Sequence, residues 1–391
     1  MSEWEQVPLE TLLSASVSYG IVQPGVGQEV GVPIVRVKDV RNGKVDVSDP
    51  LLVSSDIESK YVRTRLRGGE LLLTLVGSTG QVAVVPPQLA GWNVARAIGV
   101  LRPLPIVSPR WLQYFLESEG AQQYIHERLN TTVQATLNLK DVRLLPVALP
   151  SQEERAAIVE VLGALDDKIA FSGRIATTAD ELSGELFRYS MLARPDRFIE
   201  LALSGAAEFI NGRAFTKGAT GTGRMVVRIA DINSGPGSST VYNDIEVPDM
   251  HLARPGDVLF AWSGSLIVTR WFRPEAIINQ HIFKCVPKNG YPHWLVSQLV
   301  QRKIDGFRAI AADKATTMGH IQRKHLDEPV SVPVTEELAL LDSQIGPLWD
   351  RALLAERESL ALATLRDTLL PQLMSGRLRV KDAEKIVEDA T

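Results

Sequence analysis

The sequence predicts an α+β protein with an internal pseudo-two-fold repeat, in which two similar domains are separated by two long antiparallel helices that pair as a coiled coil. Three observations support this prediction. Short motifs recur in the same order in the two halves of the chain, strand-like and helix-like runs mix within each half, and a long run of helical spacing follows each half. A length of 391 residues suits two to three domains.

The repeat consists of matched segments whose order is kept along the chain. Residues 33–40 (PIVRVKDV) resemble residues 225–232 (MVVRIADI). Further matched pairs are Gly77-Ser78 with Gly264-Ser265, Asn93 with Asn279, Trp111 with Trp294, Thr131-Thr132 with Thr316-Thr317, and Pro150 with Pro333. We therefore divide the chain into domain 1 (1–150), a first helix (151–195), domain 2 (196–334), and a second helix with a C-terminal tail (335–391).

Each copy mixes strands and helices. Val82–Val85 and Val258–Phe260 are short apolar runs that predict strands, and Trp111–Glu119 and Trp294–Lys303 show helical spacing. Because strands and helices do not alternate strictly, this pattern favours an α+β fold over a doubly wound parallel sheet.

The first helical segment begins at a capping box formed by Ser151 and Glu154. The four-three spacing of a coiled-coil seam then follows at Ile158, Leu162, Leu165 and Ile169. We expect the seam to resume in a shifted frame at Ile175, Ala179, Leu182, Leu186 and Tyr189. Gly173 and Gly184 argue against an unbroken helix, since each glycine costs about 1 kcal/mol relative to alanine.

The second helical segment carries the same seam spacing. Its pairing positions are Leu341, Ile345, Leu348 and Ala352. We expect this helix to end at Pro371 and residues 378–391 to form a separate tail. The alternative is a pair of ordinary surface helices, but about 37 residues of helix would span about 55 Å, more than one domain. With a pseudo-two-fold axis, the helices would pair antiparallel and act as a spacer with one domain at each end.

Composition limits the possible functions. A net charge of −4 excludes a globally basic nucleic-acid binder, although a local basic face is compatible with it. The single cysteine, Cys285, excludes a disulfide framework and a cysteine-based zinc site, and fits a reducing cytoplasm. The start of the chain lacks the features of a signal peptide, and no run of about 18 apolar residues occurs. We therefore expect a cytoplasmic protein without a membrane partner.

The sequence contains no convincing catalytic motif. Pro86-Pro87 is followed by Gln88, so the Asn/Asp-Pro-Pro-Tyr/Phe element of amino-methyltransferases is absent. The glycine-rich residues 218–223 lack the Lys-Ser/Thr ending of a phosphate-binding loop. His320 and His325 have no cysteine nearby and make a poor zinc site. We expect no catalytic residue, metal or cofactor in this chain.

Several segments carry the side chains that bind DNA phosphates and base edges, namely Arg, Lys, hydroxyls and amides. Residues 60–67 are strongly basic, and strand alternation would place their arginines on one face, with a merely solvated face as an equal alternative. Residues 130–138 are rich in hydroxyls and amides. The candidates in domain 1 are Arg63, Arg65, Arg67, Ser78, Thr79, Thr131, Thr132, Gln134 and Asn138.

Domain 2 offers candidates at equivalent places in the repeat and elsewhere. They are Arg213, Lys217, Arg228, Ser263, Ser265, Arg270, Lys314, Thr316, Thr317 and His320. Arg228 matches Arg36 in the repeat, so a shared structural role is an alternative for that pair. Residues that differ between the copies are better candidates for reading sequence, because two half-sites would present different bases.

Three stretches together resemble the specificity subunit of type I restriction–modification systems. They are residues 149–158 (LPSQEERAAI), 162–169 (LGALDDKI) and 369–378 (LLPQLMSGRL). Residues 19–25 (YGIVQPG) are also similar to a frequent opening of the first recognition domain in that family. The family often has Glu-Gln after the proline, whereas this chain has Glu153-Glu154-Arg155, a departure that concerns the start of the helix.

This resemblance implies a non-catalytic subunit in which each target-recognition domain reads one half of a bipartite site on double-stranded DNA. It implies that the helices set the spacing and hold two methyltransferase subunits, with a motor–nuclease (restriction) subunit as an optional partner. The donor S-adenosylmethionine then belongs to the methyltransferase subunit. The alternative is a coiled-coil adaptor whose two domains bind proteins, which predicts no salt-dependent DNA binding by the assembled complex.

Overall fold

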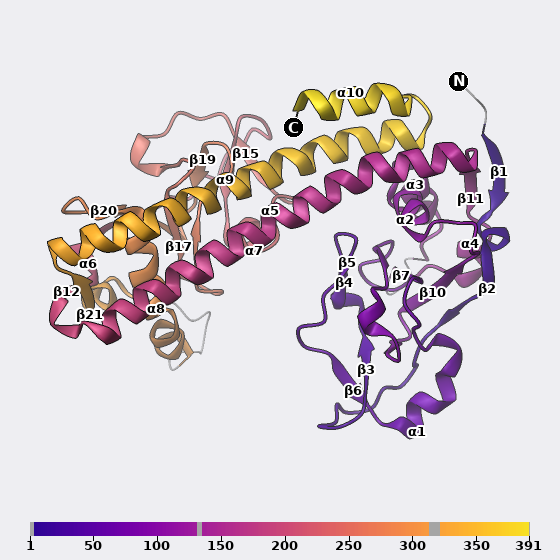
Figure 1. The fold of residues 1–391 in the computed structure, drawn as a ribbon, viewed down its shortest axis with the longest axis horizontal. Coiled ribbons are helices and arrows are strands. Elements are labelled where there is room, and N and C mark those ends of the chain that lie inside the picture. The colour runs from indigo at the N-terminus through magenta and orange to yellow at the C-terminus, as the bar shows by residue number, and fades with distance from the viewer. Residues whose placement is uncertain (1–3, 131–134, 313–320, 391) are drawn as a thin grey trace. The chain divides into compact units, whose positions relative to one another are not determined.

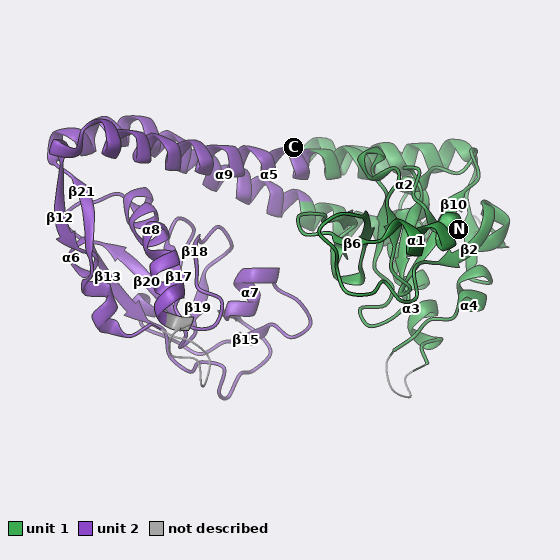
Figure 2. Ribbon diagram, turned by 90° about the horizontal axis from the view of Figure 1, so that it is seen from below, with its two compact units in different colours: residues 1–167, 363–391 green, residues 168–362 purple. Residues whose placement is uncertain are grey.

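A computed structural model describes residues 4–130, 135–312 and 321–390 of the chain. The chain forms two compact units, one made of residues 1–167 and 363–391 and the other of residues 168–362 (Figure 2). Each unit contains one α+β domain together with part of both long helices. The predicted boundaries at residues 150, 195 and 334 therefore mark changes of secondary structure along the chain and do not coincide with the limits of the compact units.

Domain 1 is built on a four-stranded antiparallel sheet with the strand order β2-β10-β7-β8. Every side chain of β7 is buried, as expected for a short apolar strand inside a sheet that is covered on both faces. The strands of this sheet are β2 (Leu13–Tyr19), β10 (Ile98–Pro103), β7 (Leu71–Thr74) and β8 (Val82–Val84). The predicted strand at 82–85 is thus confirmed.

The other strands of domain 1 form smaller sheets. A three-stranded sheet joins β6 (Leu51–Val53), β3 (Val32–Val35) and β9 (Asn93–Val94), β4 (Val40–Arg41) pairs with β5 (Lys44–Val45), and β1 (Glu5–Pro8) pairs with β11 (Pro146–Leu149). The helices are α1 (Ser55–Glu58), α2 (Pro109–Glu117), α3 (Glu119–Glu127) and α4 (Leu139–Arg143), with 3₁₀ turns at Leu9–Leu12, Val37–Asp39, Ser59–Thr64 and Pro87–Leu89. The predicted helix at 111–119 ends two residues early, and α3 follows it.

Domain 2 repeats this arrangement. Its main antiparallel sheet has the order β13-β20-β17-β18, from β13 (Ala207–Asn211), β20 (Ile282–Pro287), β17 (Val258–Ala261) and β18 (Ile267–Arg270). A second sheet has the order β15-β14-β19-β16, from β15 (Val241–Asn243), β14 (Arg224–Val227), β19 (Ala276–Ile278) and β16 (Leu252–Ala253). The pair β12 (Phe198–Ala202) and β21 (Pro329–Pro333) closes the domain.

The helices of domain 2 are α6 (Leu203–Ala206), α7 (Ile229–Ser234) and α8 (His293–Ala312), with 3₁₀ turns at Pro195–Arg197, Asp249–His251 and Arg323–Asp327. Figure 1 shows α8 beside the main sheet. The apolar core of the domain includes Phe260 from β17, Trp294 and Phe307 from α8, and Phe187, Leu341 and Ile345 from the two long helices. The long helices therefore contribute directly to the core of domain 2.

The topology confirms the internal repeat but corrects one of its matches. In both domains a parallel pair of short strands, β3 with β9 and β14 with β19, accompanies the main sheet. The amide of Ala95 donates to the carbonyl of Val35, and the amide of Asn279 donates to that of Val227, the residue equivalent to Val35. Asn279 is therefore equivalent to Ala95, and the predicted match with Asn93 is wrong by two residues.

Two long helices follow the domains along the chain, α5 (Gln152–Ala193) and α9 (Thr335–Met374), and α10 (Val380–Ala390) ends the described chain. Gly173 and Gly184 do not interrupt α5. Pro371 does not end α9 either, so that prediction is wrong. The helix ends three residues later, before Gly376, whose positive φ of 66° suits glycine.

The seam of α5 keeps one frame, so the predicted shift is also wrong. The buried positions after Ile169 are Ser172, Ala176, Ala179, Ser183, Phe187 and Ser190. In contrast, the side chains of Leu182 and Tyr189 are 46% and 71% exposed. The partner positions Ala352 and Ala355 of α9 pack with Ala176 and Ala179 in one cluster. Small side chains form the centre of this seam, which allows the two helix backbones to approach closely.

Within the second unit, the two helices run antiparallel, as predicted. Ser190, near the end of α5, donates a hydrogen bond of 2.5 Å to Glu337, near the start of α9. Farther along the pair, Ala176 meets Ala355 in the alanine cluster. The predicted pairing residues Ile158, Leu162, Leu165, Leu341, Ile345 and Ala352 are buried, and Ile169 and Leu348 are partly buried. In the described part of the chain, no helix is long and apolar enough to cross a membrane.

Candidate nucleic-acid interface

Three segments of domain 1 meet at one end of the main sheet. The amide of Leu75 at the end of β7 donates to the carbonyl of Ala97 (2.7 Å), and the amide of Leu137 donates to the carbonyl of Leu75 (2.8 Å). The amide of Gly77 in the following loop donates to the carbonyl of Ala135 (3.1 Å). The structure thus places the Gly-Ser loop beside the described part of the segment at 130–138, and no sequence pattern predicts that these two candidate segments meet.

The predicted polar residues in this region differ in exposure. Ser78 is exposed at the tip of the loop, and Thr79 is half-buried, with its hydroxyl 3.3 Å from the carbonyl of Gly77. Asn138 is exposed directly before α4, and its side chain does not cap that helix. Thr131, Thr132 and Gln134 lie outside the described residues.

Domain 2 brings together the equivalent segments. The amide of Trp262 donates to the carbonyl of His281 (3.2 Å), and the amide of Ile321 donates to the carbonyl of Trp262 (3.3 Å). Ser265 is exposed in the loop that follows, whereas Ser263 is 7% exposed. A direct contact between the Ser263 side chain and DNA is therefore not supported by this structure. Lys314, Thr316, Thr317 and His320 lie outside the described residues.

The basic segment of domain 1 is not a strand, so that prediction is wrong. Residues 59–64 form a 3₁₀ turn and residues 65–67 are irregular. Exposed and buried side chains nevertheless alternate along this segment. Arg63, Arg65 and Arg67 are exposed, and Thr64 and Leu66 between them are buried. The hydroxyl of Thr64 anchors the segment with a hydrogen bond of 2.7 Å to Oδ1 of Asn93.

The three arginines of this segment differ in whether a carboxylate neutralises their charge. Arg65 donates two hydrogen bonds, of 2.8 and 2.5 Å, to the buried carboxylate of Glu58. The hydrogen bonds from Arg65 lower the pKa of Glu58, so that carboxylate stays ionised and offsets the charge of Arg65. Arg63 and Arg67 form no ion pair with any described residue and remain the better candidates for phosphate contacts.

Arg270 is a wrong candidate. Its side chain is 3% exposed and lies at the end of β18. The guanidinium donates to Asp180 of α5 at 3.1 Å and to Glu356 of α9 at 2.9 Å, and it lies 4.4 Å from the ring centre of Trp349. A buried arginine held by two carboxylates cannot reach DNA. It instead ties domain 2 to both long helices within the second unit.

Arg228 has the structural role that the repeat left open. Its guanidinium donates to Asp231 at 3.0 Å and to the carbonyl of Ser239 at 2.5 Å. The carboxylate of Asp231 in turn accepts the backbone amide of Arg228 (3.0 Å) and so caps the start of α7. Arg36 makes the matching contacts with Asp39 and the carbonyl of Asp49. Because both copies conserve these bonds, Arg228 is a poor candidate for reading a sequence that differs between half-sites.

Arg213 and Lys217 remain candidates for DNA contacts. Both are exposed in the segment that follows β13. Arg213 lies close to His251, whose buried ring has no hydrogen-bond partner among the described residues. Burial and the nearby charge of Arg213 both lower the pKa of His251, so this histidine is neutral at pH 7.

The sequence did not single out residues 95–97 and 279–281 as candidates for DNA contacts, although the structure places them beside the Gly-Ser loop of each domain. Each segment joins a short parallel strand to the central strand of the main sheet. The missed signal was the repeat itself. When Ala95 is aligned with Asn279, Arg96 aligns with Gln280. Both residues have long polar side chains in otherwise ordinary turns.

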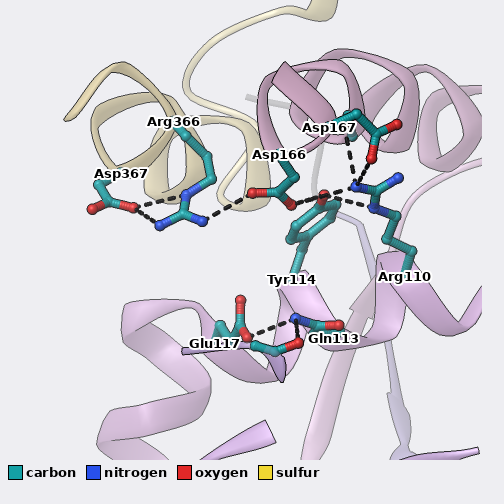
Figure 3. Close-up of polar contacts among 10 residues, drawn as sticks. Arg110, Gln113, Tyr114, Glu117, Asp166, Asp167, Arg366 and Asp367 are labelled. Carbon is teal, nitrogen blue, oxygen red and sulfur yellow. Dashed lines mark hydrogen bonds and ion pairs between the residues drawn. The ribbon is translucent and has the colours of Figure 1, made fainter. Parts of the chain in front are cut away.

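A cluster of charged groups joins domain 1 to the long helices within the first unit (Figure 3). Asp166 of α5 accepts hydrogen bonds from the Tyr114 hydroxyl (2.6 Å) and from Arg366 of α9 (2.9 Å). Arg110 of α2 reaches Asp167 at 3.0 Å. Domain 2 uses other residues for the same purpose, since Trp294 donates to Asp342 at 2.7 Å. Each domain therefore has its own set of polar bonds to α5 and α9.

Comparison with known proteins finds a family match for the N-terminal part of the chain. Residues 2–178 match the family described as the type I restriction modification DNA specificity domain. This stretch covers domain 1 and most of α5, and it belongs to that family, which confirms the resemblance predicted from the sequence.

Particular relatives agree with this class. The chain is 32% identical over 160 residues to the type I restriction enzyme EcoBI specificity subunit of Escherichia coli, a match that covers 40% of this chain and 34% of that protein. It is 22% identical over 358 residues to the MjaIX specificity subunit of Methanocaldococcus jannaschii, covering 80% of this chain and 78% of that protein. The first match thus spans about a third of its relative's length.

A solved structure shares the fold. The crystal structure of a type I restriction–modification S subunit from M. genitalium matches with a TM-score of 0.55 at 14% identity, and the match covers 95% of this chain and 96% of that chain. This likeness confirms the predicted class of fold, with two α+β domains and two long helices.

Proposed function

We propose that the chain is a sequence-specific DNA-recognition subunit that reads a bipartite target in double-stranded DNA, one half-site with each domain. The observation that carries this proposal is the pair of equivalent loop clusters, at residues 75–79 with 95–97 and at residues 262–265 with 279–281. Each cluster places exposed hydroxyls and amide or guanidinium groups on a rigid sheet end, and such groups recognise phosphates and base edges. The family of residues 2–178 supports the same assignment.

We further propose that the long helices dock two methyltransferase subunits. In the second unit, an exposed apolar stripe follows α5 at Phe171, Leu182 and Tyr189, which are 57%, 46% and 71% exposed. On α9, Leu340 and Leu354 are 41% and 51% exposed and lie two heptads apart. At 100° per residue, both stripes lie on the side of the seam opposite Asp180 and Glu356, the residues that bind Arg270 of domain 2. Figure 2 shows no other element of this unit on that side of the helices.

This shared stripe, which we call the apolar face (Phe171, Leu182, Tyr189, Leu340 and Leu354), suits an amphipathic helix of a partner protein. In this proposal the partner carries S-adenosylmethionine and performs the methylation, while this chain is non-catalytic and cytoplasmic. A motor–nuclease subunit is an optional further partner. The described residues contain no group of three or more His, Cys, Asp or Glu side chains arranged to hold a metal ion. That the helices set the gap between half-sites stays a prediction.

Genome-wide mapping of methylated bases tests this function. The gene and that of its methyltransferase partner are expressed together in a host without other DNA methylation, and each gene is expressed alone as a control. The expected result is one bipartite motif, two short defined sequences around a gap of fixed length, that appears only with both genes. Methylation with the same motif in the absence of this chain would contradict the proposal.

A further inference from the structure

Arg96 and Gln280 occupy the same backbone position in the two domains. The residue before each donates its amide to a parallel strand, from Ala95 to Val35 (2.9 Å) and from Asn279 to Val227 (3.2 Å). The carbonyl of that same residue then accepts the amide of the first residue of the central strand, Ile98 (3.0 Å) or Ile282 (3.2 Å). Two equivalent hydrogen bonds in each domain therefore hold these turns, and the side chains at the shared position differ.

Both side chains project from the loop clusters described above. Arg96 and Gln280 are exposed, whereas the nearest strand residues, Val94 and Ile98 in domain 1 and Ile278 and Ile282 in domain 2, are buried. The carbonyl of the residue that follows each one accepts the backbone amide of a residue just before the Gly-Ser loop. These bonds run from Leu75 to Ala97 and from Trp262 to His281. A side chain at this position is thus held close to the loop hydroxyls by a rigid backbone, which suits precise contacts with a ligand.

The chemical surroundings of the two side chains differ between the copies. Arg96 lies between two alanines and forms no hydrogen bond or ion pair through its guanidinium with any described residue. Gln280 lies between Asn279 and His281, with its Nε2 3.2 Å from Nε2 of His281.

In domain 2, two further polar atoms lack partners. Oδ1 of Asn279 and Nδ1 of His281 are buried and have no hydrogen-bond partner among the described residues. Asn279 as a whole is only 9% exposed. Buried polar groups without partners are costly, and they are typical of sites that a ligand completes.

We propose that Arg96 and Gln280 are specificity-determining residues that read one base each, a guanine in the half-site of domain 1 and an adenine in the half-site of domain 2. Arginine donates two hydrogen bonds to O6 and N7 of guanine, and glutamine pairs with N6 and N7 of adenine. This inference rests on the proposed function. It adds that the two domains use one backbone position with different side chains to read different bases.

The experiment exchanges the two side chains in the full complex of this chain with its methyltransferase subunit. In Arg96→Gln, the half-site of domain 1 should change its preference from G to A at one position, while the other half-site stays unchanged. In Gln280→Arg, the half-site of domain 2 should change from A to G at one position. The discrimination that one bidentate contact provides predicts an effect of about 5- to 150-fold in relative methylation of the two bases.

Two controls make the outcome decisive. Arg357→Gln removes an exposed charge from α9 and should leave the motif unchanged, and thermal unfolding checks that each variant folds as the parent does. A parent motif that neither exchange alters overturns the inference alone. Weaker methylation at all sites with an unaltered motif also overturns it, because that result is typical of a phosphate contact. A parent complex without any bipartite motif overturns the proposed function.

Discussion

The hydroxyl of Tyr114 donates a hydrogen bond of 2.6 Å to the carboxylate of Asp166, and this bond links α2 of domain 1 to the long helix α5. Tyr114 is 2% exposed, and Arg366 of α9 binds the other oxygen of the same carboxylate at 2.9 Å. One carboxylate thus joins three helices of the first unit. Burial raises the pKa of Tyr114, so its hydroxyl stays protonated and remains a donor.

Tyr114→Phe should lower the free energy of unfolding by about 1–2 kcal/mol, because it removes one donor from a partly buried carboxylate. Asp166→Asn should cost more, roughly 2–4 kcal/mol, since it also leaves Arg366 without its partner on α5. Urea unfolding of the two single variants and the double variant measures the coupling between the residues. Additive effects would contradict a direct bond, because residues in contact show coupling energies.

Glu117 predicts a dependence of stability on pH. Burial raises the pKa of this carboxyl from 4.5 to about 7, against the effect of a hydrogen bond from Gln113. Because the unfolded chain loses this proton at lower pH than the folded chain, stability falls as pH rises from about 4.5 to about 7 and is level above that. Glu117→Gln should therefore be more stable than the parent by roughly 1–3 kcal/mol at pH 8 and similar at pH 4. Denaturant unfolding at both values checks this, and an equal difference at both would exclude titration of Glu117 as the cause.

The repeat and the fold class were accessible from the sequence because they depend on features that sequence preserves directly. The segment PIVRVKDV and its counterpart MVVRIADI keep in both copies an Asp that caps the following turn and an Arg whose side chain bonds that Asp. Residue identity aligns Asn93 with Asn279, whereas the backbone position equivalent to Asn279 is Ala95, two residues later. Asn93 instead bonds Thr64 and Glu58 inside domain 1.

The seam of α5 was predicted in the wrong frame for a physical reason. The spacing of large apolar residues selects Leu182 and Tyr189 as seam positions. The structure places Ala176, Ala179 and Ser183 in the seam instead, since small side chains allow close helix packing there. Leu182 and Tyr189 beside them remain exposed, so these side chains are available to contact a partner protein.

The sequence predicts both Arg270 and Arg213 as DNA contacts, but in the structure Arg270 is buried and Arg213 is exposed. Arg270→Gln should destabilise the protein by about 3 kcal/mol, because it leaves Asp180 and Glu356 without their cation. It should leave the methylated motif unchanged. Arg213→Gln removes an exposed charge and should leave stability unchanged while it weakens DNA binding by the complex. Thermal unfolding and salt-dependent DNA binding of both variants check this, and a motif altered by Arg270→Gln would restore it as a DNA contact.

No residue pattern distinguished these two arginines in advance. Charge alone predicts a surface position, whereas the burial of Arg270 depends on Asp180 and Glu356, which are remote in sequence. The candidate site was predictable only where a loop and its polar residues lie together in the chain, as at Ser78 and Thr79. The meeting of that loop with residues 95–97 depends on the strand order of the sheet.

The apolar face gives a final prediction about assembly. Leu182→Glu and Leu354→Glu place a charge in the middle of the proposed docking surface on α5 and α9, and a charge buried without a partner opposes binding. Each should weaken binding of the methyltransferase subunit at least tenfold, which corresponds to about 1.4 kcal/mol. Both side chains are about half exposed in the isolated chain, so the free energy of unfolding should change little. Thr177→Glu, an exposed site on the polar side of α5, is the matched control and should bind as the parent does. Titration calorimetry with the purified subunits measures these three variants and the double variant with Leu182→Glu and Leu354→Glu. If the double variant with both charges bound its partner with unchanged affinity, the helices would have to dock that subunit through another surface.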